Sequence, residues 1–132
     1  MIFILIMEQI YSLLMGLSAA MSWKSLLWCF YGSLLGTLVG VLPGIGPITA
    51  LSLLLPVATH LDPMSAMIFL ASVYYGTQYG GSTASILLNL PGTPGNAITC
   101  LDGYPMCKQG KGGLALSTSA ISSAIGGLIG IV

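Results

Sequence analysis

From Ser25 to Leu42 the sequence, SLLWCFYGSLLGTLVGVL, contains no charged side chain. A helix needs about 18 to 20 apolar residues to cross roughly 30 Å of hydrocarbon, and this segment just reaches that length. We therefore predict a transmembrane helix over residues 25–42. The fold class that follows is an all-α, polytopic membrane protein.

The charge content of the whole chain supports the same fold class. Of the 132 residues, 55% are hydrophobic and only 5% are charged, against about 25% charged residues in a typical soluble domain. There is no arginine, and the formal net charge is zero, so the chain has no basic surface for a phosphate backbone. These features predict a lipid bilayer as the surroundings and exclude nucleic acid as a partner.

Two further apolar segments lie at the two ends of the sequence, at residues 1–21 and 114–132. Residues 1–21 lack a positive leading region and contain Glu8, which argues against a cleaved signal and for an interfacial or first membrane helix. Residues 114–132 predict another transmembrane helix. This last segment ends on Gly-Ile-Val without a polar flank, so we expect a truncated sequence with one transmembrane region over 1–132.

Between these apolar segments, residues 97–113 predict a polar connection. They contain Asp102-Gly103-Tyr104-Pro105 and two lysines, Lys108 and Lys111. By the positive-inside tendency, the lysines would place this connection in the cytoplasm.

Glycines recur every four residues in both predicted transmembrane helices. Such spacing puts them on one helix face, where the missing side chains let another helix approach closely. We predict helix packing at Gly32, Gly36, Gly40, Gly126 and Gly130.

Residues 43–96 predict broken and short helices, because proline and glycine interrupt them three times. The interruptions are Pro43–Pro47, Gly76–Ser82 and Pro91–Asn96. Proline removes an amide donor and glycine loosens the backbone, so we expect a helix break at each. In lipid, the freed backbone groups persist only where protein or a wet cavity satisfies them.

Broken helices of this kind build the sites of secondary transporters. The amides at a half-helix N-terminus attract anions, and unwound carbonyls with nearby hydroxyls bind cations. The breaks also carry side chains with such donors and acceptors: Thr49, Thr77, Gln78, Ser82, Asn89, Thr93 and Asn96.

Four motifs in order resemble one known family. They are Gly36-x-x-x-Gly40-x-Leu42-Pro43-Gly44-Ile45-Gly46-Pro47, Tyr74-Tyr75-Gly76-Thr77-Gln78-Tyr79-Gly80-Gly81-Ser82, Asn89-Leu90-Pro91-Gly92-Thr93-Pro94 and Leu101-Asp102-Gly103-Tyr104-Pro105. Together they resemble the TctA family, the large membrane subunits of bacterial tripartite tricarboxylate transporters, from Gly32 to Val132.

The resemblance implies a secondary carrier of tricarboxylates or related carboxylates in the bacterial inner membrane. It implies a longer, multi-pass parent protein of two inverted halves, with this chain as part of the first. The implied partners are a small membrane subunit and a periplasmic substrate-binding protein. No cofactor is expected beyond a coupling ion, sodium or a proton.

With this resemblance, the breaks become the predicted substrate or ion site. Its residues are Pro43, Gly44, Gly46, Thr77, Gln78, Gly80, Gly81, Ser82, Asn89 and Thr93. For Pro91–Asn96, a plain loop is an equal alternative. His60 and Asp62 resemble a proton pair, but their place before Pro63 favours capping of the next helix.

Other functional classes find little support in the residues. One histidine without a nucleophile and an orienting group does not predict an enzyme. The three cysteines lack metal-site spacing, so no metal is expected. The alternative from another class is a non-transporting membrane scaffold that packs through its glycine seams.

Overall fold

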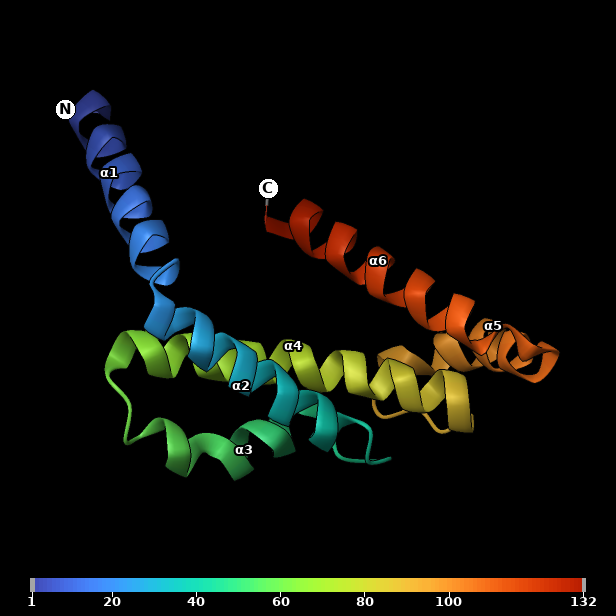
Figure 1. Cartoon of the computed structure of the whole chain (residues 1–132). Coiled ribbons are helices and arrows are strands. Elements are labelled where there is room, and N and C mark those ends of the chain that lie inside the picture. Colours follow the sequence, from blue (N-terminus) through green and yellow to red (C-terminus); the bar gives the residue numbers. More distant parts are fainter. Residues whose placement is uncertain (1, 132) are drawn as a thin grey trace.

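The structure, a computed structural model, describes residues 2–131, and the described residues contain helices and no strand. The helices are α1 (Ile2–Ala20), α2 (Trp23–Gly40), α3 (Pro47–Ala58), α4 (Pro63–Leu88), a 3-10 turn η1 (Pro94–Asn96), α5 (Ala97–Met106), a π-helical turn η2 (Cys107–Lys111) and α6 (Gly112–Ile131). The predicted all-α class is confirmed. Helices α2, α3 and α4 form the body of the molecule, from which α1 and α6 project (Figure 1).

Helices α2 and α4 pack through the predicted glycine seam. A β-carbon on Gly32 would lie 2.6 Å from the carbonyl oxygen of Phe69, while Gly36 lies against the backbone of Val73 and Gly40 against that of Thr77. The contacts advance by four residues along both helices in the same direction, so α2 and α4 run parallel. Their backbones touch because no side chain separates them.

Gly76 and Gly80 of α4 complete this contact from the other side. A β-carbon on Gly76 would meet the Ser33 backbone of α2, and one on Gly80 would meet the Thr37 backbone. The predicted break at Gly76–Ser82 is therefore wrong, since α4 runs without interruption from Pro63 to Leu88. Glycine costs a helix only about 1 kcal/mol relative to alanine, and this segment has no proline, so close packing keeps it helical.

A small apolar core lies where α3 covers α2 and α4. Phe69 and Val73 are fully buried against Ala50 and Ala58 of α3. The Trp28 ring meets Phe69 edge to face, with 5.9 Å between centroids. This core fixes α3 beside the α2–α4 pair.

The turn between α3 and α4 is closed by Asp62. Its carboxylate accepts a hydrogen bond from the backbone N–H of Ser65, so it caps α4, as predicted. It also pairs with Lys24 at the start of α2. The hydrogen bond from Lys24 and the Ser65 amide lower the pKa of Asp62 to about 2. One carboxylate thus links the first turns of α2 and α4.

The predicted polar connection at 97–113 is built from helix. Residues Ala97–Lys111 are helical, including Asp102 and Pro105, and Gly103 lies against Ile86 of α4. The change of direction comes at Gly110, whose φ of 78° favours glycine. After it, α6 turns back above α4 (Figure 1).

Two parts of the described chain qualify as candidate membrane spans by length and hydropathy. One is the helical run Pro94–Gly130, and the other is the pair α1–α2, bent by 71° at Met21–Ser22. The predicted span over 25–42 thus qualifies only together with α1. At Gly126 and Gly130 an added β-carbon would have no atom within 4 Å in the described chain, so the predicted packing contact is not made there.

Candidate functional site

The first break lies between α2 and α3, where the predicted interruption at Pro43–Pro47 is present. Residues 41–46 are non-helical, and Gly44 has a φ of 81°, which a side chain would resist. Helix α3 then begins at Pro47, and its N-cap residue, Gly46, has no side chain to satisfy the first amides.

These first amides of α3 are left without intrahelical partners. The first helical bond runs from the Ala50 N–H to the Gly46 carbonyl, at 3.1 Å. Because Pro47 has no N–H, the free donors are the amides of Ile48 and Thr49. They carry the positive end of the helix dipole.

The second break follows α4 and is also present, at residues 89–93. Asn89 ends the helix in the left-handed conformation, with φ 58° and ψ 30°, and its N–H donates to Ser85. The chain then folds back along α4, where Gly92 touches Gly81. Gly92 also lies beside the carbonyl oxygen of Gly40, so this break lies next to the C-terminal end of α2.

The two breaks share one hollow of about 540 Å³, which we call the break hollow. Its lining comes from both breaks and from the middle of α4: Gly44, Gly46, Pro47, Ile48, Thr49, Gln78, Gly92, Thr93, Pro94 and Gly95. Its volume is within the range of small-molecule sites. None of these side chains carries a charge.

Four of the ten predicted site residues line the break hollow: Gly44, Gly46, Gln78 and Thr93. Pro43 lies in the first break beside it. Thr49 also lines the hollow, although the predicted site does not include it. Its place on the first turn of α3, directly after the Pro/Gly run, is the sequence signal that marks it.

The other predicted residues have different surroundings. Thr77 is buried in the α2–α4 seam, and its hydroxyl donates to the Val73 carbonyl at 2.7 Å. Gly80 lies in the same seam and Gly81 lies against Asn96 and Gly92. Asn89 is exposed as the C-cap of α4. The structure gives these four residues packing or capping contacts.

Ser82 faces a second hollow, of about 620 Å³, on the side of α4 toward α6. We call it the tyrosine hollow; it is lined by Tyr74, Tyr75, Gln78, Tyr79, Ser82, Asn96, Ser123, Ala124, Gly126 and Gly127. Gln78 lines both hollows, and its amide donates to the Tyr74 hydroxyl at 3.4 Å. The two hollows are therefore neighbours on α4.

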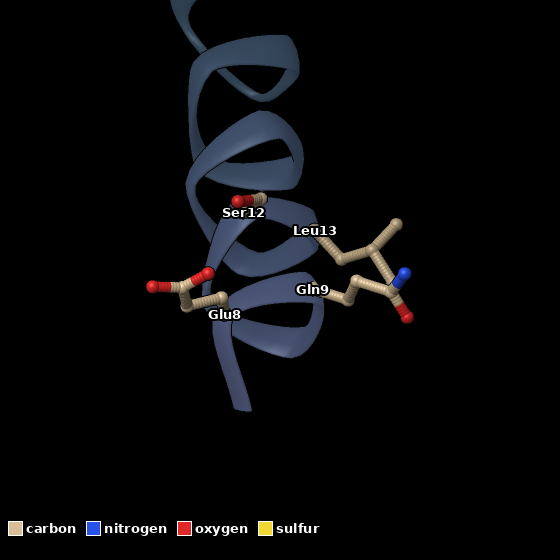
Figure 2. A pocket seen from close by; sticks show the side chains of 4 residues that line it. All are labelled: Glu8, Gln9, Ser12 and Leu13. Atoms are coloured by element: carbon tan, nitrogen blue, oxygen red, sulfur yellow. The ribbon is translucent and has the colours of Figure 1, made fainter. Parts of the chain in front are cut away.

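A third hollow lies on α1 and is lined by Glu8, Gln9, Ser12 and Leu13. All four residues come from consecutive turns of one exposed helix. Figure 2 shows that Glu8 points away from Gln9 and Leu13. These side chains do not converge, so this surface does not form a binding site.

Comparison with known proteins agrees with the motifs. The family model described as "Tripartite tricarboxylate transporter TctA family" matches residues 26–132. A curated relative from Agrobacterium vitis, an "Uncharacterized 52.8 kDa protein in TAR-I ttuC' 3'region", is 47% identical over 123 residues.

That match covers 93% of this chain and 24% of the relative, so the chain spans about a quarter of the relative's length. No solved structure matches. The chain belongs to the tripartite tricarboxylate transporter TctA family, a family of transporters.

Proposed function

We propose that this chain forms part of the large permease subunit of a tripartite secondary carrier for tricarboxylates or related carboxylates. In this proposal it acts in the bacterial inner membrane as part of a multi-pass protein. Its partners are a small membrane subunit and a periplasmic substrate-binding protein. Family membership supports the transport class, and the break hollow supports a place for the ligand.

The observation that carries the proposal is the meeting of two helix breaks at one hollow. Helix α3 begins on this hollow with free amides at Ile48 and Thr49. Thr49, Gln78 and Thr93 add side-chain donors around it. Hydrogen bonds from uncharged donors and a helix dipole bind a carboxylate without a lysine or arginine. Binding of this kind also allows release, which a carrier requires.

We infer that a coupling cation binds beside the same hollow. Helix α2 ends at Gly40, and the Gly40 carbonyl oxygen lies 3.3 Å from the point where a β-carbon of Gly92 would be. The C-terminal carbonyls of a helix carry partial negative charge and bind cations. Of the two coupling ions, a proton needs a titratable group, and no lining residue of the break hollow supplies one. We therefore favour sodium at this position.

The test is carboxylate uptake by cells that contain the full chain and the other subunits. Replacing Gln78 with Ala removes a donor from the hollow, and we expect uptake of the transported carboxylate to fall about tenfold at unchanged membrane abundance. The matched control is Gln109→Ala, on the exposed η2 turn away from both hollows. Equal uptake by the two variants at equal abundance would refute the role of the hollow.

The scaffold alternative predicts a different result. The glycine seam on α2 is occupied by α4 of the same chain, so these glycines do not call for a separate partner helix. A scaffold would lose abundance or assembly, and not uptake alone, when Gln78 is replaced.

A further inference from the structure

The side chain of Asn96 leaves its own helix to bind α4. Asn96 is the N-cap residue of α5, where asparagine ordinarily bonds to an amide of the first turn, yet it makes no such bond. Its Nδ2 donates to the Gln78 carbonyl at 3.5 Å, and its Oδ1 accepts from the Ser82 hydroxyl at 3.2 Å. The side chain thus binds two residues of α4 that precede it by 14 and 18 positions in the sequence.

The surface of α4 is shaped to admit this side chain. Gly81 lies under the Asn96 amide, and a β-carbon at position 81 would overlap Nδ2. Gly92 packs on Gly81 beside it. Asn96 is only 9% exposed, so its polar atoms need these partners. The two glycines and the buried amide form one contact between the second break and α4.

The position of this contact relates it to both hollows. Asn96 and Ser82 line the tyrosine hollow, whereas Thr93 and Gly95, just before Asn96, line the break hollow. Gln78, whose carbonyl Asn96 binds, lines both. The Asn96–Ser82 bond therefore lies at the boundary between them.

We propose that Asn96 is a positioning residue that holds the second break against α4 and so keeps the wall of the carboxylate site closed toward the tyrosine hollow. This inference rests on the proposed function of the break hollow. Loss of the Asn96 bonds releases residues 92–95 from α4 and exposes the break hollow from its second side. Asn96 itself does not touch the ligand.

The experiment measures how fast a cysteine at position 93 reacts with a membrane-impermeant maleimide. The Thr93→Cys variant is made in the full chain, without its native cysteines and with the other subunits present. Adding Asn96→Ala raises the labelling rate by about threefold, because bonds of 3.5 and 3.2 Å are longer than usual and contribute at the low end of the ordinary range. Adding Ser117→Ala, which removes an exposed hydroxyl on α6, leaves the rate unchanged.

A double variant separates this local effect from general loosening. Because Asn96 and Ser82 are bonded, Ser82→Ala raises labelling in the same direction, and Asn96→Ala with Ser82→Ala gives no more than Asn96→Ala alone. A second reporter, Ser52→Cys on the exposed face of α3, labels at one rate in every background. If Asn96→Ala does not accumulate in the membrane, the labelling rate is measured in Ser82→Ala instead.

Unchanged labelling of Thr93→Cys in both variants would overturn the inference, as would a parallel rise at position 52. The labelling rate is measured without a transported solute, so its result is independent of the result of the uptake test. Loss of uptake in Gln78→Ala with unchanged labelling in Asn96→Ala would refute the positioning role alone. Altered labelling with normal uptake in Gln78→Ala would refute the ligand site and keep the contact.

Discussion

Gly81 in the middle of α4 and Gly92 in the second break are in direct contact: a β-carbon on Gly92 would lie 2.8 Å from the α-carbon of Gly81. The end of α2 reaches the same place through the Gly40 carbonyl. Three segments meet here at glycines, which have no side chains to keep them apart. This close contact brings the two breaks, which are far apart in sequence, to one hollow.

This contact predicts that position 92 does not accept even a methyl group. Gly92→Ala forces the second break away from α4, and we expect a loss of about 1 to 3 kcal/mol in unfolding free energy. The measurement is unfolding of the purified protein in detergent. The matched control is Gly95→Ala, where the nearest atom to the new β-carbon is 3.9 Å away. Equal stability of the two variants would contradict the contact.

The seam between α2 and α4 makes a similar prediction. Gly36→Ala places a methyl group against the Val73 backbone, which cannot move aside as a side chain does. We expect destabilisation of about 1 to 3 kcal/mol and reduced membrane abundance. Gly16→Ala on α1, where a β-carbon meets nothing within 4 Å, serves as control. If Gly36→Ala unfolds at the control's temperature, the two backbones are not in contact.

Asn89 is predicted to act through its backbone. Its left-handed conformation, with φ 58°, is open to glycine and asparagine but costs a β-branched residue about 1 to 2 kcal/mol. We expect Asn89→Gly to retain both stability and uptake, whereas Asn89→Val loses stability. Thermal unfolding and carboxylate uptake measured side by side check this. Loss of uptake in a stable Asn89→Gly protein would instead show a side-chain role.

The Asp62 cap predicts a defined pH dependence. The Lys24 hydrogen bond and the Ser65 amide lower the pKa of Asp62 from 3.8 to about 2, so the charged form stabilises the folded state. This contribution is complete above the unfolded value and is lost as the pH falls toward 2. We expect Asp62→Asn, which keeps a capping oxygen but not the ion pair, to unfold at a lower temperature than the parent at neutral pH. The difference should vanish at acid pH, and a difference that stays constant would contradict the assignment.

Much of the helical framework could be predicted from the sequence, because its signals are local. The Pro43–Pro47 and Pro91–Asn96 breaks each combine two prolines with glycine, whereas the lone prolines Pro56 and Pro105 lie inside helices. The cap at Asp62 has its signal in the adjacent Pro63. The spacing of Gly32, Gly36 and Gly40 predicts a helix contact, though not which helix fills it.

The errors came where one residue type serves two purposes. Glycine loosens a helix, but it also allows a second backbone to approach, and Gly76 and Gly80 do the latter. Only the position of α2 decides between these roles. The helical form of the polar connection at 97–113 likewise depends on a distant contact, because Gly103 packs on Ile86 of α4.

The candidate site depends on the fold in the same way. The sequence indicated the two breaks that contain proline, and Gly44, Gly46 and Thr93 from these breaks line the break hollow. Gln78 also lines it, although it was predicted from a break at Gly76–Ser82 that is absent. The sequence did not indicate that Thr77 points into a seam, or that Asn96 crosses to Ser82, because both depend on contacts between distant segments.

The most direct test of the account asks whether a carboxylate occupies the break hollow. Thr49→Cys, on the first turn of α3, is labelled with a maleimide in membranes that contain the whole system, with and without citrate as the test tricarboxylate. Other carboxylates that the system takes up follow in the same assay. We predict that a transported carboxylate slows labelling at position 49 by about fivefold or more while Ser52→Cys, one turn away on α3, is unaffected. Equal labelling of Thr49→Cys with and without every carboxylate that the system transports would contradict the account.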